Sequence, residues 1–152
     1  MAHFAKLGID NIVLNVIVVA DANTSTVGGI EKEDLGLDYL ERTTGHVNWK
    51  KCSFNTIEGV HVTGKTPLRV HYPSAGWYYD STNDIFHPPR PVDKDGTSCA
   101  SWTLNLSTAI WNPPITIPTL TDAEDLSGKY YTWDESAYQL DNTKGWILTS
   151  ST

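Results

Sequence analysis

Residues 12–19 constrain the fold more than any other part of the chain. The segment reads Ile-Val-Leu-Asn-Val-Ile-Val-Val, so large apolar residues fill all but one position. Side chains alternate between the two faces of a strand, and here both sets are apolar: Ile12, Leu14, Val16 and Val18 on one face, Val13, Ile17 and Val19 on the other. A strand that is apolar on both faces has to be covered on both faces.

The flanking residues place this strand in a hairpin followed by a helix. Gly8-Ile9-Asp10-Asn11 has turn composition and separates residues 4–7 from the apolar run, which predicts a β-hairpin. Acidic residues in the first turn and apolar residues at helical spacing predict a short helix over residues 30–42, with Gly45 as its stop. Asp10 stands where a signal peptide carries positive charge, so we interpret the apolar run as a strand and not as an export signal.

The predicted helix can cover only one face of this strand. We therefore expect the hairpin to pack against another subunit or a second copy of the chain through Val13, Ile17 and Val19, because an uncovered apolar surface promotes aggregation.

An aromatic motif occurs three times in the second half of the chain. Trp77-Tyr-Tyr-Asp80, Trp102-Thr-Leu-Asn105 and Tyr131-Thr-Trp-Asp134 are each followed, at the same distance, by a large apolar residue, which is Phe86, Trp111 and Leu140 in turn. Aromatic positions two apart share one face of a strand, Asp or Asn opens a turn, and a following proline ends the return strand. Each copy is predicted to be a β-hairpin with these core aromatics: Trp77, Tyr79, Phe86, Trp102, Trp111, Tyr131 and Trp133.

These patterns predict a mainly β protein with one short helix, of the α+β class, divided at residue 72. Residues 1–72 are expected to form the N-terminal hairpin, helix and strands, as a domain for attachment and assembly. Residues 73–152 are expected to form three tandem aromatic hairpins, a modular body that can be elongated instead of spherical.

Charge and length exclude several classes of function. The 152 residues carry a formal net charge of −7, which argues against binding to nucleic-acid phosphates. No run approaches the roughly 18 consecutive apolar residues of a membrane span. Cys52 and Cys99 lack metal-ligand spacing, so we expect two buried, reduced thiols and synthesis in a reducing cytoplasm.

Two apparent motifs are better explained as turns. The segment Gly59-Val-His-Val-Thr-Gly-Lys-Thr66 satisfies the P-loop pattern, but Pro67 follows at once and residues 68–70 are β-prone, whereas the motif needs a helix there. We therefore expect a strand at 60–62, a turn at Gly64 and a further strand at 68–70. Asp93-Lys-Asp-Gly96 begins like a calcium loop, but Leu104 occupies its twelfth position, so we expect a solvated turn. We predict no catalytic residue, no metal site and no cofactor.

The chain resembles small virion structural proteins of marine tailed bacteriophages, especially those that infect cyanobacteria. The likeness runs in order along nearly the whole chain, and it rests on these residues: Met1-Ala-His-Phe-Ala-Lys6, Trp49, Ser53-Phe-Asn-Thr56, Gly59-Val-His61, Leu68-Arg69, Tyr72, Gly76, Tyr79-Asp80, Asp84, Phe86, Pro88-Pro89, Ser101-Trp-Thr-Leu-Asn105, Trp111, Pro113, Tyr131 and Trp133-Asp-Glu135. Leu140 stands where this family would carry Trp.

The resemblance implies a non-enzymatic component of a bacteriophage virion, as a capsid decoration protein or a tail- or fibre-associated protein. Its partners would be capsid or tail subunits or copies of itself, with no nucleic acid and no membrane, and it would be made in the bacterial cytoplasm. The alternative is a carbohydrate-binding module that contacts a host envelope glycan through exposed Trp or Tyr on the hairpins, since aromatic faces stack on sugar rings.

Overall fold

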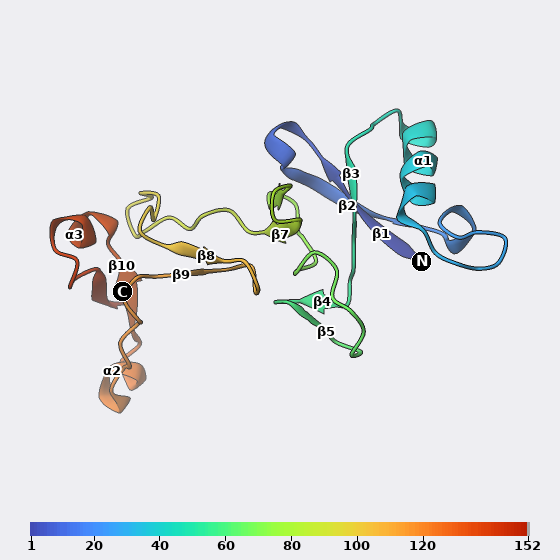
Figure 1. The fold of residues 1–152 in the computed structure, drawn as a ribbon. Helices are drawn as coiled ribbons and strands as arrows, with labels where there is room; N and C mark the ends of the chain where they lie inside the picture. Colours follow the sequence, from blue (N-terminus) through green and yellow to red (C-terminus); the bar gives the residue numbers. More distant parts are fainter. Residues whose placement is uncertain (152) are drawn as a thin grey trace. The chain divides into compact units, whose positions relative to one another are not determined.

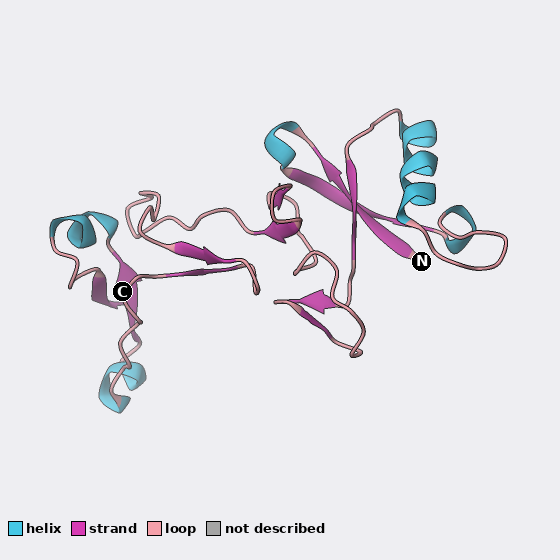
Figure 2. Ribbon diagram, viewed as in Figure 1, coloured by secondary structure: helices cyan, strands magenta, loops and turns pink. Residues whose placement is uncertain are grey.

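The computed structural model describes residues 1–151, which form small antiparallel sheets and short helices (Figures 1 and 2). The elements are β1 (Ala2–Leu7), η1 (Ile9–Asn11), β2 (Val13–Val19), η2 (Asp21–Asn23), α1 (Glu33–Thr44), β3 (Trp49–Cys52), β4 (Thr56–Ile57), β5 (Val60–His61), β6 (Tyr78–Asp80), β7 (Ile85–His87), β8 (Thr103–Asn105), β9 (Ile110–Asn112), α2 (Asp122–Leu126), β10 (Lys129–Trp133), α3 (Glu135–Leu140) and β11 (Trp146–Ser150). With 19% of the chain helical and 32% in strands, the mainly β class is confirmed. No helix among the described residues is long and apolar enough to cross a membrane.

The chain divides into two compact units. The N-terminal unit contains Met1–Pro89 and Asn105–Ile110, and the C-terminal unit contains Arg90–Leu104 and the chain from Trp111 onward. These units do not divide at residue 72, because the first aromatic hairpin lies in the N-terminal unit.

A three-stranded antiparallel sheet in the order β2-β1-β3 organises the N-terminal unit. The predicted hairpin is present, and Phe4 of β1 pairs with Ile17 of β2 and with Lys51 of β3. Leu7 pairs with Val13 and Lys6 with Asn15, so Leu14 is the extra residue of a β-bulge.

Helix α1 covers one face of this sheet. It begins and ends close to the predicted bounds, and Gly45 closes it in the left-handed conformation at φ 71°, donating its N–H to the Glu41 carbonyl. A Cβ atom at Gly36 would lie 2.3 Å from Phe4 Cζ, so this glycine lets the helix approach the sheet. The apolar core on this side contains Ala2, Phe4, Val19, Leu40 and Trp49.

The β6–β7 hairpin supplies the second apolar core of the N-terminal unit. Tyr79 and Phe86 are 7% and 0% exposed and pack with Ala5, Leu7, Val13 and Cys52. The two apolar clusters bury Val13 and Val19 and partly bury Val16 and Ile17 within their own chain, whereas Leu14 and Val18 stay about half exposed. The β6–β7 hairpin belongs to the N-terminal unit because it supplies part of this cover.

The first two copies of the aromatic repeat form the predicted hairpins, β6–β7 and β8–β9. Their turns are built alike: the side chains of Asp80 and Asn105 accept hydrogen bonds from N–H groups two residues on, at 2.9 Å in both cases. Asp84 and Ala109 then adopt φ values of 52° and 60°, just before the return strand.

The third copy is not a hairpin of the predicted kind. Asp134 accepts a hydrogen bond from Ala137 N–H as the N-cap of α3, and Leu140, expected on a return strand, ends this helix with 91% of its surface exposed. The reason is that Asp caps helices as well as turns, and Glu-Ser-Ala-Tyr-Gln-Leu favours a helix after it. β10 pairs with β11 instead, with Trp133 opposite Trp146.

Candidate functional site

The three residues predicted to contact a partner lie in or against the core of the N-terminal unit. Val13 and Val19 are 1% and 2% exposed and belong to its two apolar clusters, and Ile17 is partly buried against the α1 side. These side chains therefore do not lie on the outer surface where the contact was expected, because they pack within the two apolar clusters against α1 and the β6–β7 hairpin.

The part of β2 that remains accessible is its outer edge. Leu7 N–H donates to the Asn48 carbonyl on the β3 side. The N–H and C=O groups of successive strand residues point to opposite sides, so those of Phe4 and Lys6 point toward β2. There these two residues pair with Ile17 and Asn15. The N–H and C=O groups of Val16 and Val18 then point away from the sheet. The side chains of Leu14 and Val18 are 49% and 52% exposed, so this edge, residues 14–18, is both unpaired and apolar.

Only the first residues of β2 have a neighbour on this outer side. Val13 N–H donates to the Trp77 carbonyl at 2.7 Å, and Gly76 N–H donates to the Val13 carbonyl at 2.8 Å. Within residues 1–151 no bridge or backbone hydrogen bond continues this pairing along residues 14–18.

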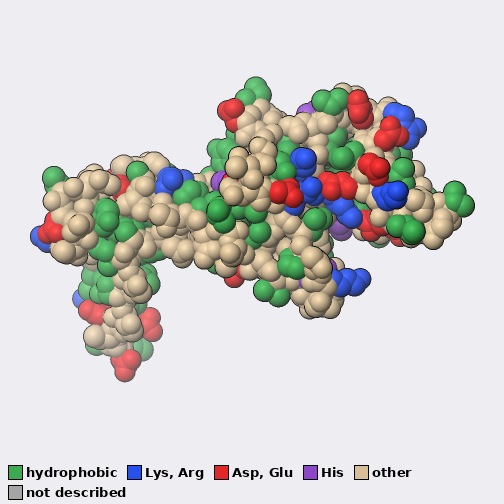
Figure 3. Space-filling view, viewed as in Figure 1, with side chains coloured by type: hydrophobic (Ala, Val, Ile, Leu, Met, Phe, Trp, Pro, Cys, Tyr) green, Lys and Arg blue, Asp and Glu red, His purple; other side chains and the backbone are tan. Residues whose placement is uncertain are grey.

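The opposite edge of the sheet, at β3, is closed by two charged side chains. Glu33 Oε1 accepts a hydrogen bond from Lys51 N–H at 3.1 Å, and Arg69 donates to the Lys51 carbonyl at 2.8 Å. Acidic and basic side chains accordingly lie side by side on one face of this unit (Figure 3). The backbone groups at the β3 edge of the sheet are thus bonded to side chains, whereas those at the β2 edge are free to pair with another strand.

Arg69 joins the main parts of the N-terminal unit. Its side chain is 9% exposed and donates to Glu33 of α1 and, at 2.7 Å, to Asp84 of the β6–β7 turn. Tyr79 also donates to Asp84, at 2.6 Å. Partial burial acts to raise the pKa of Asp84, but the hydrogen bonds from Tyr79 and Arg69 outweigh it and the pKa is lowered. Asp84 therefore stays charged as the anchor of this network.

The strand expected at residues 68–70 is absent. Arg69 and Val70 have φ values of 51° and 66°, in a region that β-branched residues rarely adopt. Their carbonyls accept hydrogen bonds from Phe86 N–H and Gly59 N–H. This bend aims the Arg69 guanidinium at α1 and β3, so we interpret the strained backbone as structural.

The predicted core aromatics are placed unevenly. Tyr79, Phe86 and Trp133 are buried, whereas Trp77, Trp102, Trp111 and Tyr131 are partly buried. In the C-terminal unit Trp133 contacts Trp102 and Trp146 at ring-centroid distances of 5.9 and 5.1 Å. The Arg90 guanidinium carbon lies 4.4 Å from the centre of the Trp111 ring. Tyr79 thus packs on Phe86 and Trp133 on Trp102, whereas Trp77 packs on His71 and Trp111 on Arg90.

The most buried carboxylate of the C-terminal unit was not singled out from the sequence. Glu135 is 3% exposed and accepts hydrogen bonds from Ser101 N–H and Oγ, Trp133 Nε1 and Gln139 Nε2, at 2.8 to 2.9 Å. Burial acts to raise the pKa of Glu135, but the hydrogen bonds from Trp133, Gln139 and Ser101 outweigh this effect, so the pKa is lowered. A single acidic residue after Trp-Asp carries no sequence pattern that would indicate this role.

The turn expected at residues 93–96 is present and residues 94–96 are exposed, but Asp93 itself is buried and has a structural role. It is 9% exposed, and its side chain accepts hydrogen bonds from the N–H groups of Asp95, Thr97 and Glu135 at 2.8 to 3.0 Å. Burial opposes the charged form, but these donors lower the pKa of Asp93. The turn is thus tied to the start of α3, and among the described residues no cluster of acidic, His or Cys side chains could hold a metal ion.

The remaining motifs are placed largely as predicted. β5 lies within the expected strand at 60–62, and Gly64 turns the chain at φ 77° while its N–H donates to the His61 carbonyl. Cys52 and Cys99 are free and buried. Burial raises the pKa of Cys52 to about 12, so its thiol is protonated and unreactive at neutral pH.

Comparison with protein-family models, with curated proteins and with solved structures finds no match for this chain.

Proposed function

We propose that this chain is a non-enzymatic structural component of a bacteriophage particle, and that it assembles through the outer edge of β2. The observation that supports an assembly role is the contrast between the two edges of the N-terminal sheet. β3 is closed by Glu33 and Arg69, whereas residues 14–18 of β2 offer unpaired backbone groups beside two exposed apolar side chains. Edges of this kind are templates for pairing with another strand.

The proposed occupant of this edge is β2 of a second copy. Residues 12–19 contain no charged side chain, although the chain as a whole carries a net charge of −7. Two β2 strands can therefore pair antiparallel about a two-fold axis without placing like charges opposite each other. In a particle, such a pair would form the repeating contact of a decoration or tail-associated protein.

Analytical ultracentrifugation of the purified chain tests the pairing. We expect the wild type to dimerise and Val18→Lys to be monomeric with an unchanged melting temperature, since a lysine at a strand edge blocks pairing but leaves the core intact. The matched control is Leu126→Lys, which adds the same charge at a side chain that is 88% exposed in α2 and should still dimerise. A monomeric wild type, or a dimeric Val18→Lys variant, would contradict the proposed contact.

Electron cryomicroscopy of purified phage particles tests the location. We expect ordered, symmetry-related copies of the chain in contact with capsid or tail subunits. If the chain is made during infection but absent from purified particles, the proposed role is wrong.

A further inference from the structure

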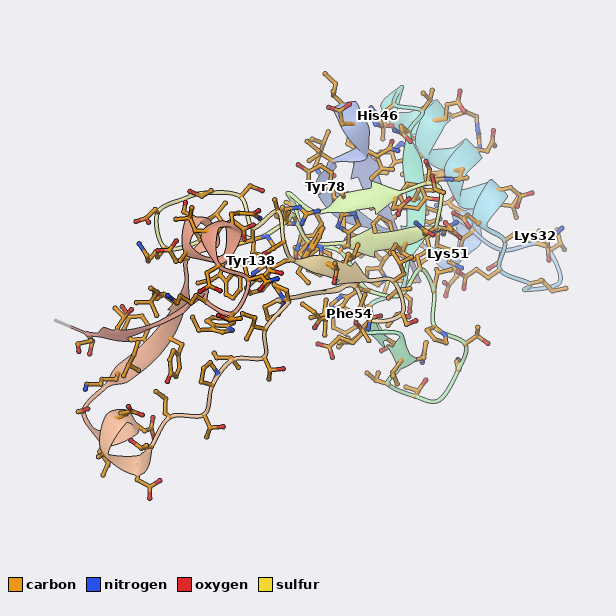
Figure 4. All side chains as sticks on the ribbon, turned by 60° about the vertical axis from the view of Figure 1, so that its left-hand side comes forward. Lys32, His46, Lys51, Phe54, Tyr78 and Tyr138 are labelled. Carbon is orange, nitrogen blue, oxygen red and sulfur yellow. The ribbon has the colours of Figure 1, made fainter. Side chains whose placement is uncertain are left out.

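An open groove of about 510 Å³ lies entirely within the N-terminal unit. Its walls come from residues 1–3 at the start of β1, Glu31 before α1, the end of β3, the turn at residues 53–55, β5, and the loop at residues 65–68. Figure 4 labels Lys51, in the strand β3, and Phe54, which follows the end of that strand. The proposed assembly edge of β2 contributes no residue to this groove.

The groove is basic in a protein that is acidic overall. Lys51, Lys65 and His61 line it, and Glu31 is its only acidic lining residue. Glu31 forms an ion pair with Lys51, so the charge of Lys65 is left uncompensated by the other lining residues. The groove therefore favours an anionic ligand.

Phe54 gives the groove an exposed aromatic wall. Its side chain is 66% exposed, so the ring is accessible to a ligand. The ring is nevertheless held in place, because His3 stacks on it at 6.0 Å and Tyr72 meets it edge-on at 5.6 Å. Ser53 and Asn55, on either side of Phe54, add hydroxyl and amide groups to the lining.

We propose that this groove binds an acidic saccharide, a pyranose ring that carries a carboxylate. The apolar face of such a sugar would pack on Phe54, its carboxylate would pair with Lys65 and its hydroxyls would bond to Ser53 and Asn55. A phosphate ligand fits less well, because the turn here has few N–H groups to offer. Gly64 N–H donates to the His61 carbonyl and Thr63 N–H to His61 Nδ1.

Nuclear magnetic resonance titration of the full chain with a mannuronate tetrasaccharide tests the proposal, with neutral mannotetraose as the matched sugar. We expect chemical-shift changes centred on residues 53–55 and 61–65 with the acidic sugar only. Lys65→Ala should weaken binding about tenfold, the usual effect of losing one charge-assisted hydrogen bond, and Phe54→Ala should weaken it to a similar extent. Raising the salt concentration should weaken the wild type toward the Lys65→Ala level.

Two variants outside the groove serve as controls. Lys32→Ala removes an exposed lysine, and Tyr130→Ala removes an aromatic side chain that is 46% exposed in the C-terminal unit. Both should bind the acidic sugar as the wild type does. The proposal is overturned if neither sugar binds, if both bind equally, if the shifts fall on the C-terminal Trp residues, or if only inorganic phosphate shifts the groove residues.

This inference is independent of the proposed assembly. Val18→Lys should keep saccharide binding while it loses the dimer, and Lys65→Ala should keep the dimer while it loses binding. If one of the two proposals fails, the experiment on the other still gives an independent answer.

Discussion

At the scale of single residues, two buried carboxylates organise the C-terminal unit. Glu135 accepts four hydrogen bonds, and Asp93 binds the backbone at the start of α3. The pKa of each is lowered because the donors outweigh the effect of burial. A carboxylate with a lowered folded pKa stabilises the fold fully above its unfolded pKa, and this contribution is lost as the pH falls through the folded pKa.

We expect Glu135→Gln to destabilise the C-terminal unit by about 3 kcal/mol, because an amide NH₂ group then faces buried donors. The variant should also lose less stability than the wild type as the pH falls below about 4.3, the ordinary pKa of Glu. Urea unfolding followed by Trp fluorescence at several pH values measures both effects. Glu124→Gln is the control, because Gln also completes the exposed capping box of α2; equal losses in both variants would contradict the proposed role of Glu135.

At the scale of elements, the same aromatic sequence motif is followed by a tight turn in two copies and by a helix in the third. Asp80 and Asn105 open tight turns, whereas Asp134 caps a helix, although all three occupy the same position of the sequence motif. The residues after each Asp or Asn decide between the two, since Ser-Thr-Asn and Leu-Ser-Thr favour turns and Glu-Ser-Ala-Tyr favours a helix.

This difference predicts that two residues of the third copy contribute very unequally to stability. Trp133→Ala should destabilise the C-terminal unit by roughly 3–5 kcal/mol, since it leaves a cavity among Trp102, Tyr138 and Trp146. Leu140→Ala should change stability by less than about 0.5 kcal/mol, because Leu140 is exposed. Thermal unfolding followed by near-ultraviolet circular dichroism compares the two variants. A large loss of stability in Leu140→Ala would contradict the exposed position of Leu140 and support the hairpin predicted from the sequence.

At the scale of the whole molecule, each of the two units has its own aromatic centre. Phe86 and Tyr79 belong to the N-terminal core, and Trp133 and Trp146 belong to the C-terminal one. If each unit unfolds separately, its backbone amides are protected from hydrogen exchange as a separate group.

We expect Phe86→Ala to lower amide protection in β1, β2 and β3 and to leave β10 and β11 nearly unchanged, and Trp133→Ala to do the reverse. Hydrogen exchange followed by nuclear magnetic resonance measures this residue by residue. Equal loss of protection throughout the chain in both variants would show one cooperative unit instead of two.

The sequence by itself determined the features that depend on neighbouring residues: the N-terminal hairpin, α1 with its Gly45 stop, and the turns after Asp80 and Asn105. It also required that β2 be covered on both faces. Only the tertiary structure decided what covers it, because Phe86 and Val13 are far apart in the chain and no local pattern links them. The same holds for Glu135, for the Arg69 closure of β3, and for the open β2 edge, since each depends on which distant backbone groups the fold brings within hydrogen-bonding distance.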